Sequence, residues 1–267
     1  MTLIIGVRLD SYYDPLRSES YMNQIFTSIE PLGEGAFGVV SKVEHRYTNK
    51  RYAVKKLRNE NNELTDEEKY SEISYYERIG DHPNVVQYIM AWEQWDDLKE
   101  WDEVYLLLEL CQMSLGSFVL SGCKLPERFF WDCLYDMCQA IVHLNSKQVL
   151  HRDISSGNIL LQGTCFKLGD FDLMSDLTLK TQRTRRRRRL RLHRYDILCL
   201  GDVMAKIVLN ATTANPLLEM CDALTNTIEW MRLPEPADRP SPQDILDLPE
   251  LREAEIRLTC RLPYCSE

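Results

Sequence analysis

The distribution of apolar and polar positions divides the chain into a strand-rich part and a helix-rich part. Up to about residue 110, short runs of alternating or β-branched apolar residues predict strands at 26–29, 38–43, 51–57, 85–92 and 104–110. Residues 63–79 are rich in Glu, Lys and Tyr and lack Gly and Pro, which predicts a partly exposed helix. We expect an acidic loop containing Trp95 and Trp101 between the last two strands, and residues 1–25 are polar without a clear period.

From Pro126 onward the apolar positions follow a helical period. The pattern predicts a long helix over Glu127–Ser146, short strands near Val149 and over Ile159–Leu168, and an apolar helix over Tyr195–Leu209. Residues 216–258 predict further helices, interrupted by several prolines. Strands followed by helices predict an α+β fold with two lobes.

The length of 267 residues is compatible with one large domain or two lobes. The net charge of the chain is −9. The charge is uneven, since residues 183–194 contain eight arginines and no acid. This arginine run has three interpretations: a solvated activation segment, a patch for nuclear import or for an acidic partner, or a pseudosubstrate-like brake. We expect no nucleic-acid binding, because aromatic residues are not interleaved with the arginines.

The nine cysteines are scattered singly, which predicts reduced thiols rather than a disulfide or zinc framework. The N-terminal apolar stretch is too short for a signal peptide. No run approaches the ~20 apolar residues of a membrane span, so we expect no membrane segment and a cytoplasmic or nuclear location.

A glycine-rich pattern lies between two predicted strands, at Gly33-Glu34-Gly35-Ala36-Phe37-Gly38-Val39-Val40. Glycines at positions 33, 35 and 38 would let the backbone approach nucleotide phosphates, and Val40 could cover the base. A glycine-rich hairpin turn explains the pattern equally well. A dinucleotide-binding turn is disfavoured, because a strand and not a helix follows the last glycine.

Lys55 lies on the third predicted strand, in the run Tyr52-Ala53-Val54-Lys55 with apolar strand residues around it, and a buried lysine needs anionic partners. Phosphates and a carboxylate from the following helix would supply them. Glu72 is the first candidate for that carboxylate, with Glu68 and Glu77 as alternatives. Lys56 would face the opposite side and be solvated, although a shift of one residue in the strand would exchange the two lysines.

The most specific motif is His151-Arg152-Asp153-Ile154-Ser155-Ser156-Gly157-Asn158. In this pattern the aspartate accepts a hydroxyl proton from the substrate and the asparagine binds magnesium. Asp170 follows in the sequence Asp170-Phe171-Asp172 and would bind the magnesium that bridges the phosphates. The order and spacing of all these motifs make a chance origin improbable.

These motifs resemble those of the protein kinase family over roughly residues 26–252. Within that family the chain is most similar to the Wee/Myt branch, with kinases of translation initiation factor two alpha as the alternative. The segments that carry the resemblance to the Wee/Myt branch are Tyr13–Tyr21, His82–Val86, Ala91–Glu93, Glu109–Cys111 and Leu246–Arg252.

The resemblance implies an N-terminal extension (1–25), a kinase N-lobe (26–111), a C-lobe (112–252) with a shortened activation segment (about 170–195), and a tail (253–267). It implies binding of ATP and Mg²⁺. The ATP-binding set would be Gly33, Gly35, Gly38, Val40, Lys55, Glu72, Glu109 and Cys111, with Leu108 as gatekeeper. Asp153, Lys55 and Asn158 would be catalytic, and Asn158 and Asp170 would hold the metal.

The chain departs from the family pattern in ways that bear on activity. Ser155 stands where serine/threonine kinases usually have a lysine, which removes a positive charge near the γ-phosphate. Asp172 replaces the glycine of Asp-Phe-Gly. Only 26 positions separate Asp170 from Asp196, no Ala-Pro-Glu triplet occurs, and Arg239 therefore lacks its usual glutamate partner.

The leading hypothesis is a monomeric protein kinase acting on Ser/Thr or also Tyr of a protein, with a cyclin-dependent kinase as the substrate implied by the resemblance. Such an enzyme would be a negative regulator of the cell cycle. The alternative is a pseudokinase that binds nucleotide and acts as a scaffold. A third hypothesis is a truncated product whose large lobe does not fold stably.

Overall fold

The computed structural model describes residues 2–5, 10–35, 38–57, 65, 70–96, 101–123, 125–176, 194–216 and 218–252. The chain divides into two compact units. The first unit comprises residues 1–81 and 86–110, and the second comprises residues 82–85 and 111–267.

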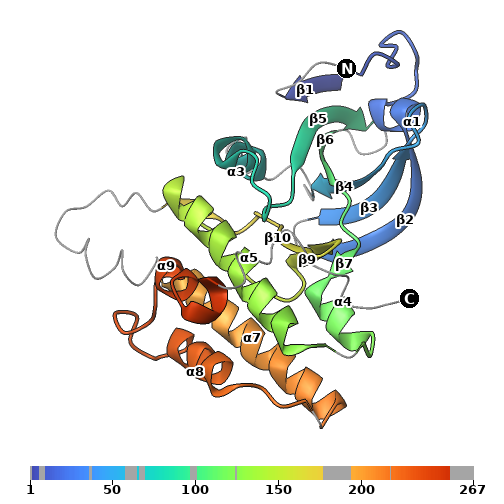
Figure 1. The fold of residues 1–267 in the computed structure, drawn as a ribbon. Coiled ribbons are helices and arrows are strands. Elements are labelled where there is room, and N and C mark those ends of the chain that lie inside the picture. The colour runs from blue at the N-terminus through green and yellow to red at the C-terminus, as the bar shows by residue number, and fades with distance from the viewer. Residues whose placement is uncertain are drawn as a thin grey trace, which may run out of the picture. The chain divides into compact units, whose positions relative to one another are not determined.

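The first unit is built on a six-stranded antiparallel sheet (Figure 1). Among the residues that the structure describes, the helices α1 (Tyr21–Ile25) and α3 (Ser71–Ile79) accompany the sheet. The order across the sheet is β1 (Thr2–Ile5), β5 (Tyr88–Asp96), β6 (Trp101–Glu109), β4 (Arg51–Leu57), β3 (Gly38–His45) and β2 (Phe26–Gly35).

Several details differ from the sequence predictions, including the unpredicted strand β1 and the extension of β2 to Gly35. Trp95 and Trp101 belong to β5 and β6, where they pair with residues of the opposite strand rather than forming a loop. The predicted helix at 63–79 is α3, which begins only at Ser71, and Thr65 is not helical. The N-terminal part contains α1, whose first turn is capped by the Ser20 hydroxyl.

The core of the first unit is an aromatic cluster that includes residues preceding β2. Trp92 stacks on Tyr105 and on Phe26, with ring centroids 5.1 and 6.0 Å apart, and Tyr21 lies 5.1 Å from Trp92. Tyr21, Phe26 and Trp92 are all buried. The segment around α1 is therefore part of the packed unit, because its aromatic side chains cover apolar surface of the sheet.

The second unit is mainly helical (Figure 1). The α5 helix is almost entirely buried and contacts α7 and α9. Its described helices are α4 (Leu115–Leu120), α5 (Glu127–Ser146), α7 (Tyr195–Ala214), α8 (Asp222–Met231) and α9 (Pro242–Leu246). One small sheet has the strand order β10 (Cys165–Leu168), β9 (Ile159–Gln162), β7 (Met113–Ser114). A second small sheet pairs β11 (Ser175–Asp176) with β8 (Val149–Leu150).

The α7 helix corrects the expectation that nothing in the chain approaches the dimensions of a membrane span. It has 20 residues and is apolar enough to cross a membrane by length and composition. A core helix of a globular protein passes the same test. The side chains of Ile197, Leu200 and Met204 are buried and the helix contacts α4, α5 and α8, while 39% of its apolar stretch is buried.

The cysteines also differ in part from expectation. Six of the cysteines in the described ranges are free, including the buried Cys133 and Cys138. Burial raises the pKa of the Cys138 thiol far above its ordinary value, so it is unreactive. Cys123, however, is disulfide-bonded. The prediction of reduced thiols throughout is therefore wrong at this position.

Candidate active site

Lys55 and Glu72 form a buried ion pair within the first unit. The Lys55 Nζ lies 3.0 Å from each carboxylate oxygen of Glu72. Both residues are almost fully buried, and a buried ammonium is stable only with such a partner. The structure pairs Lys55 with Glu72 rather than with Glu77, which is exposed, and Glu68 lies outside the described residues.

Lys56 faces the other side of β4. Its Nζ lies 2.5 Å from the buried carboxylate of Glu103 and 5.7 Å from the centre of the Tyr105 ring. Lys56 therefore faces the opposite side as expected and its side chain is 36% exposed, but it also forms an ion pair with a buried carboxylate of β6 that the sequence did not indicate. In the register of β4, Lys55 is paired with Val40 and is the lysine that contacts α3.

The glycines of the β2–β3 hairpin differ in how much space their surroundings leave for a side chain. A Cβ at Gly38 would lie 2.3 Å from the backbone oxygen of Lys56, so the close approach of β3 and β4 requires glycine there. A Cβ at Gly33 or Gly35 would meet nothing within 4 Å. Packing against the described residues therefore does not require glycine at these two positions. Ala36 and Phe37 lie outside the described residues.

The predicted gatekeeper Leu108 and the predicted ATP-binding residues Glu109 and Cys111 lie at and just after the end of β6. Leu108 is buried and pairs with Ala53 of β4. The carboxylate of Glu109 accepts the backbone N–H of Gln87 at 2.7 Å, and the N–H of Glu109 donates to the carbonyl of Gln87 at 3.0 Å. Cys111, at the start of the second unit, is a half-buried free thiol.

In the second unit, the buried carboxylate of Asp196 holds the turn that precedes Asp153. It accepts the backbone N–H of His151 at 2.9 Å and that of Arg152 at 2.8 Å. Arg152 has a φ of 70°, a left-handed conformation that costs free energy for a non-glycine residue. Burial raises the pKa of the Asp196 carboxyl, and His151 and the two N–H donors oppose this effect.

His151 connects this turn to the segment that carries Asp170. Its Nε2 lies 3.0 Å from the carbonyl of Gly169, and its Nδ1 accepts the backbone N–H of Asp153 at 3.2 Å. Burial lowers the pKa of His151, so the ring is neutral with its proton on Nε2. The buried ring of Phe171 packs edge-on against His151, with centroids 5.3 Å apart.

Asp153 and Asn158 are joined directly. The Nδ2 of Asn158 donates to the backbone oxygen and to Oδ2 of Asp153, both at 2.9 Å. This leaves Oδ1 of Asn158 as the amide atom available to a cation. The N–H of Gly169 donates to the carbonyl of Asn158 at 2.9 Å, and the N–H of Asn158 donates to the Ser155 hydroxyl at 3.3 Å.

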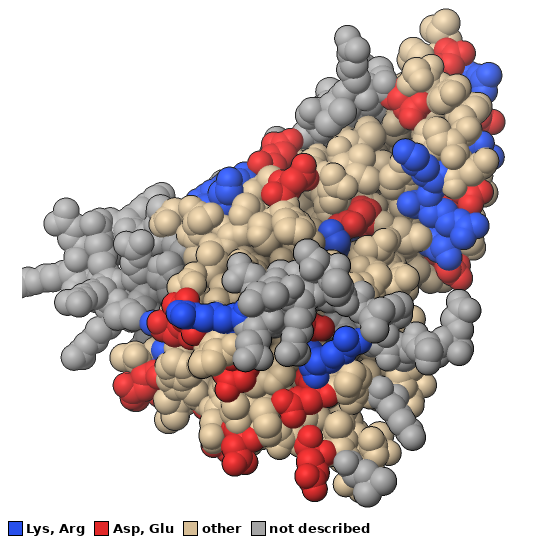
Figure 2. Space-filling model, viewed as in Figure 1, with Lys and Arg blue, Asp and Glu red and all other residues tan. Residues whose placement is uncertain are grey.

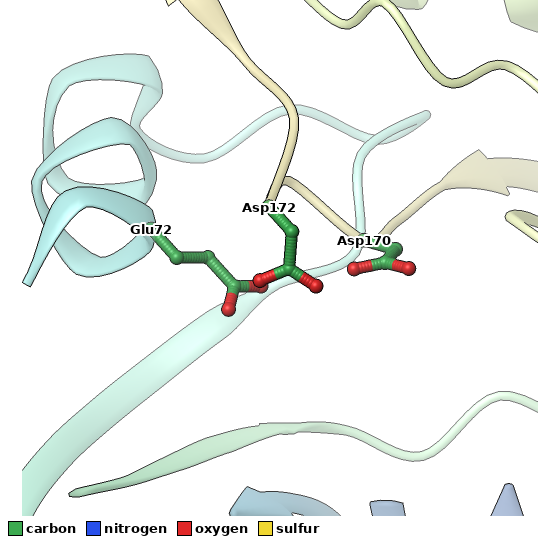
Figure 3. Close-up of side chains that lie close together, drawn as sticks. All are labelled: Glu72, Asp170 and Asp172. Carbon is green, nitrogen blue, oxygen red and sulfur yellow. The ribbon is translucent and has the colours of Figure 1, made fainter. Parts of the chain in front are cut away.

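Asp170 and Asp172 follow β10, and Figure 3 shows their carboxylates. Oxygen atoms of the two aspartates lie within 4.8 Å of one another. Adjacent carboxylates repel each other, and a hard cation with oxygen ligands relieves the repulsion. The oxygen donors of Asp170 and Asn158 fit Mg²⁺, and Asp172 adds a carboxylate beside them.

Arg239 has hydrogen-bond partners although the chain lacks the Ala-Pro-Glu glutamate that usually pairs with this arginine. Backbone carbonyls take the place of that glutamate. Its guanidinium donates to the backbone oxygens of Leu233 at 2.6 Å, Pro234 at 2.9 Å and Arg194 at 3.5 Å. Arg239 is buried, and these carbonyls satisfy it. Residues 183–193 of the arginine run and the tail from residue 253 lie outside the described residues.

Asn84 supports the site and received no role in the sequence analysis. Its side chain donates to the carbonyl of Phe166 at 3.1 Å, and its carbonyl accepts the N–H of Leu168 at 2.9 Å. Asn84 thus holds β10, which leads directly to Asp170. The His-Pro-Asn motif was the available signal, because asparagine can bond a strand edge through both its backbone and its amide.

Comparison with known proteins agrees with this geometry. A model of the protein kinase domain matches residues 26–191, and the chain therefore belongs to the protein kinase family. The sheet-based first unit and the helical second unit are the two lobes of the kinase fold, which confirms the predicted fold class.

Several relatives belong to the branch that the sequence resembles. The chain is 30% identical over 266 residues to a membrane-associated tyrosine- and threonine-specific cdc2-inhibitory kinase of Drosophila melanogaster, covering 88% of this chain and 49% of that protein. It is 34% identical over 166 residues to the kinase wee-1.3 of Caenorhabditis elegans, covering 62% of this chain and 24% of that protein. A more distant kinase, mitogen-activated protein kinase 15 of Xenopus laevis, is 30% identical over 161 residues. The resemblance to the Wee/Myt branch is confirmed, and the chain spans about half or less of these relatives' length.

Proposed function

We propose that this protein kinase transfers the γ-phosphate of Mg-ATP to a hydroxyl group of a protein substrate. The observation that carries the proposal is the ordered turn at Asp153. Asp196 holds the backbone of His151 and Arg152, and Asn158 holds the carboxylate of Asp153. The proposed general base is therefore placed on a rigid backbone.

Each residue has a defined role in this proposal. Lys55, oriented by Glu72, holds the α- and β-phosphates, and the glycines at 33, 35 and 38 let the backbone approach them. Asp153 orients the substrate hydroxyl and accepts its proton as the new P–O bond forms and the bond to ADP breaks. Asn158 and Asp170 would hold Mg²⁺, which neutralises charge on the phosphates when bound. Most of the rate enhancement then comes from positioning and electrostatics.

The proposed substrate is a cyclin-dependent kinase, and the proposed effect is its inhibition. Support comes from the names of the relatives, which describe cdc2-inhibitory kinases specific for tyrosine and threonine. We propose the same two hydroxyl types for this chain.

A second candidate function is a nucleotide-binding pseudokinase that acts as a scaffold. Two observations favour it: Ser155 offers no positive charge beside Asp153, and the segment between Asp170 and Asp196 is short and lacks Ala-Pro-Glu. The substrate-binding part of the site would then be incomplete, whereas Lys55 and Glu72 would still serve nucleotide binding.

The test is transfer of radiolabelled γ-phosphate to a purified cyclin-dependent kinase and to a generic basic protein, with Asp153→Asn as the control. Transfer that disappears in the variant supports an enzyme. A rise in thermal unfolding temperature with Mg-ATP in both proteins, without transfer in either, would establish the pseudokinase instead. The absence of any cooperative unfolding transition would indicate a chain that does not fold.

A further inference from the structure

The second unit has a cavity on the surface of α8 that the proposed function does not use. The cavity measures about 380 Å³. Its lining residues on α8 lie at positions i, i+3, i+4 and i+7, which is one stripe of the helix. We call it the α8 groove, and it is lined by Ala223, Asn226, Thr227, Trp230, Leu248 and Glu250.

The groove is shaped by side chains whose own polar groups are satisfied. The Trp230 Nε1 donates to the carbonyl of Asp238 at 3.0 Å, which fixes the indole ring. The Thr227 hydroxyl donates to the carbonyl of Ala223 at 2.7 Å within the helix. The groove is shallow and open, and the surface that it exposes is mainly apolar, so an apolar side chain can pack against it.

The surroundings of the groove are acidic. Residues 219–252 contain eight carboxylates and three arginines. All three arginines are engaged: Arg232 with Asp202 at 2.7 Å, Arg252 with Asp247 at 3.7 Å, and Arg239 with backbone carbonyls. Figure 2 shows acidic side chains gathered on the lower part of the second unit, in the region where Figure 1 places α7 and α8.

Three carboxylates beside the groove are exposed: Asp222, Glu229 and Glu250. None of them has an ion-pair partner among the residues with described placement.

We propose that the α8 groove docks a basic segment of a protein partner. An aliphatic side chain of the partner occupies the cavity, and flanking Arg or Lys residues face Glu229, Glu250 and Asp222. The charge complementarity excludes an anionic partner surface and accelerates association with a cationic one. This surface goes beyond the proposed catalytic function, and its binding does not require phosphoryl transfer.

The experiment measures fluorescence anisotropy of a labelled decapeptide of alternating Arg and Leu. We expect a Kd on the order of 10 µM at low salt, and weaker binding as salt rises. The double variant Glu229→Lys/Glu250→Lys should weaken binding by about 10-fold or more, and Asn226→Arg should weaken it severalfold. A peptide with Ser in place of Leu should also bind severalfold more weakly.

The matched control is Glu77→Lys/Asp81→Lys, which changes the net charge equally at exposed positions of the first unit. Equal weakening by the control and the groove variants would overturn the proposal, because net charge alone would then explain the binding. Equal affinity for the Ser peptide would overturn the role of the cavity. If the peptide binds only after Arg185–Arg189 are replaced by Gln, the proposal of a protein partner is overturned, because the chain's own arginine run would then be the occupant of the groove.

Discussion

The carboxylate of Asp196 accepts the backbone N–H of Arg152 at 2.8 Å and so holds Arg152 at a φ of 70°. The same carboxylate accepts the N–H of His151. A buried side chain of α7 thereby compensates a strained backbone that leads into the proposed general base. The conformation of Asp153 depends on a contact between residues 44 positions apart in the sequence.

Replacing Asp196 with Asn should therefore destabilise the fold and slow transfer. The amide has one acceptor oxygen for two N–H groups, and leaving one buried N–H unpaired costs about 1–3 kcal/mol. We expect a similar loss of unfolding free energy in urea, and transfer about 10- to 100-fold slower as Asp153 loses its position. Asp202→Asn on the same helix is the control, because its ion pair with Arg232 is exposed and contributes less than about 1 kcal/mol. Equal effects of the two variants would contradict this role of Asp196.

Replacing Arg239 with Met should cost about 2–4 kcal/mol of unfolding free energy, because buried carbonyls lose their donor. Arg239→Lys should recover part of this, since an ammonium reaches fewer of the three oxygens. Chemical denaturation measures both, with the exposed Arg232→Met as the control. If Arg239→Met were as stable as the control, the bonds to Leu233, Pro234 and Arg194 would not contribute to stability.

Replacing Ser155 with Lys should increase the rate of phosphoryl transfer, if the missing charge limits turnover. A cation beside the developing charge is worth up to a few kcal/mol, so the expected gain is about 10- to 100-fold in kcat. Ser155→Gln is a control that adds length without charge, and both variants lose the 3.3 Å contact with the N–H of Asn158. A gain of the same size with Gln would show that charge is not the cause.

Stability should fall as the pH drops below about 6.5, in part because of His82. Burial, together with the nearby His143 and Lys167, lowers the pKa of His82 to about 4. The folded state therefore binds this proton less readily than the unfolded state, so the contribution is complete above pH 6.5 and is lost as the pH falls toward 4. Because His82 is partly exposed, we expect its contribution to the unfolding free energy to fall by about 1–2 kcal/mol between pH 6.5 and pH 4.

The measurement is the unfolding free energy in urea between pH 4 and 8, for the wild type and for His82→Asn. The variant should show a smaller loss toward low pH. Identical pH profiles would mean that His82 does not titrate differently in the folded protein.

The sequence alone determined the elements and motifs whose signal is local. The α5 helix begins and ends as predicted, because its apolar period runs unbroken from Glu127 to Ser146. Fold class and family followed from motifs in a fixed order along the chain. Local patterns failed where packing decides: α1 is stabilised by the aromatic cluster around Trp92, and the ends of β5 and β6 by their pairing.

Only the tertiary structure decided which partners the charged residues have. Spacing left Glu68, Glu72 and Glu77 as partners of Lys55, and the contact of α3 with the sheet selected Glu72. The sequence left Arg239 without its usual glutamate partner, and folding brings backbone carbonyls to it instead. The physical reason is the same in each case: a buried charge must be satisfied, and the group that satisfies it comes from a distant segment that only folding brings near.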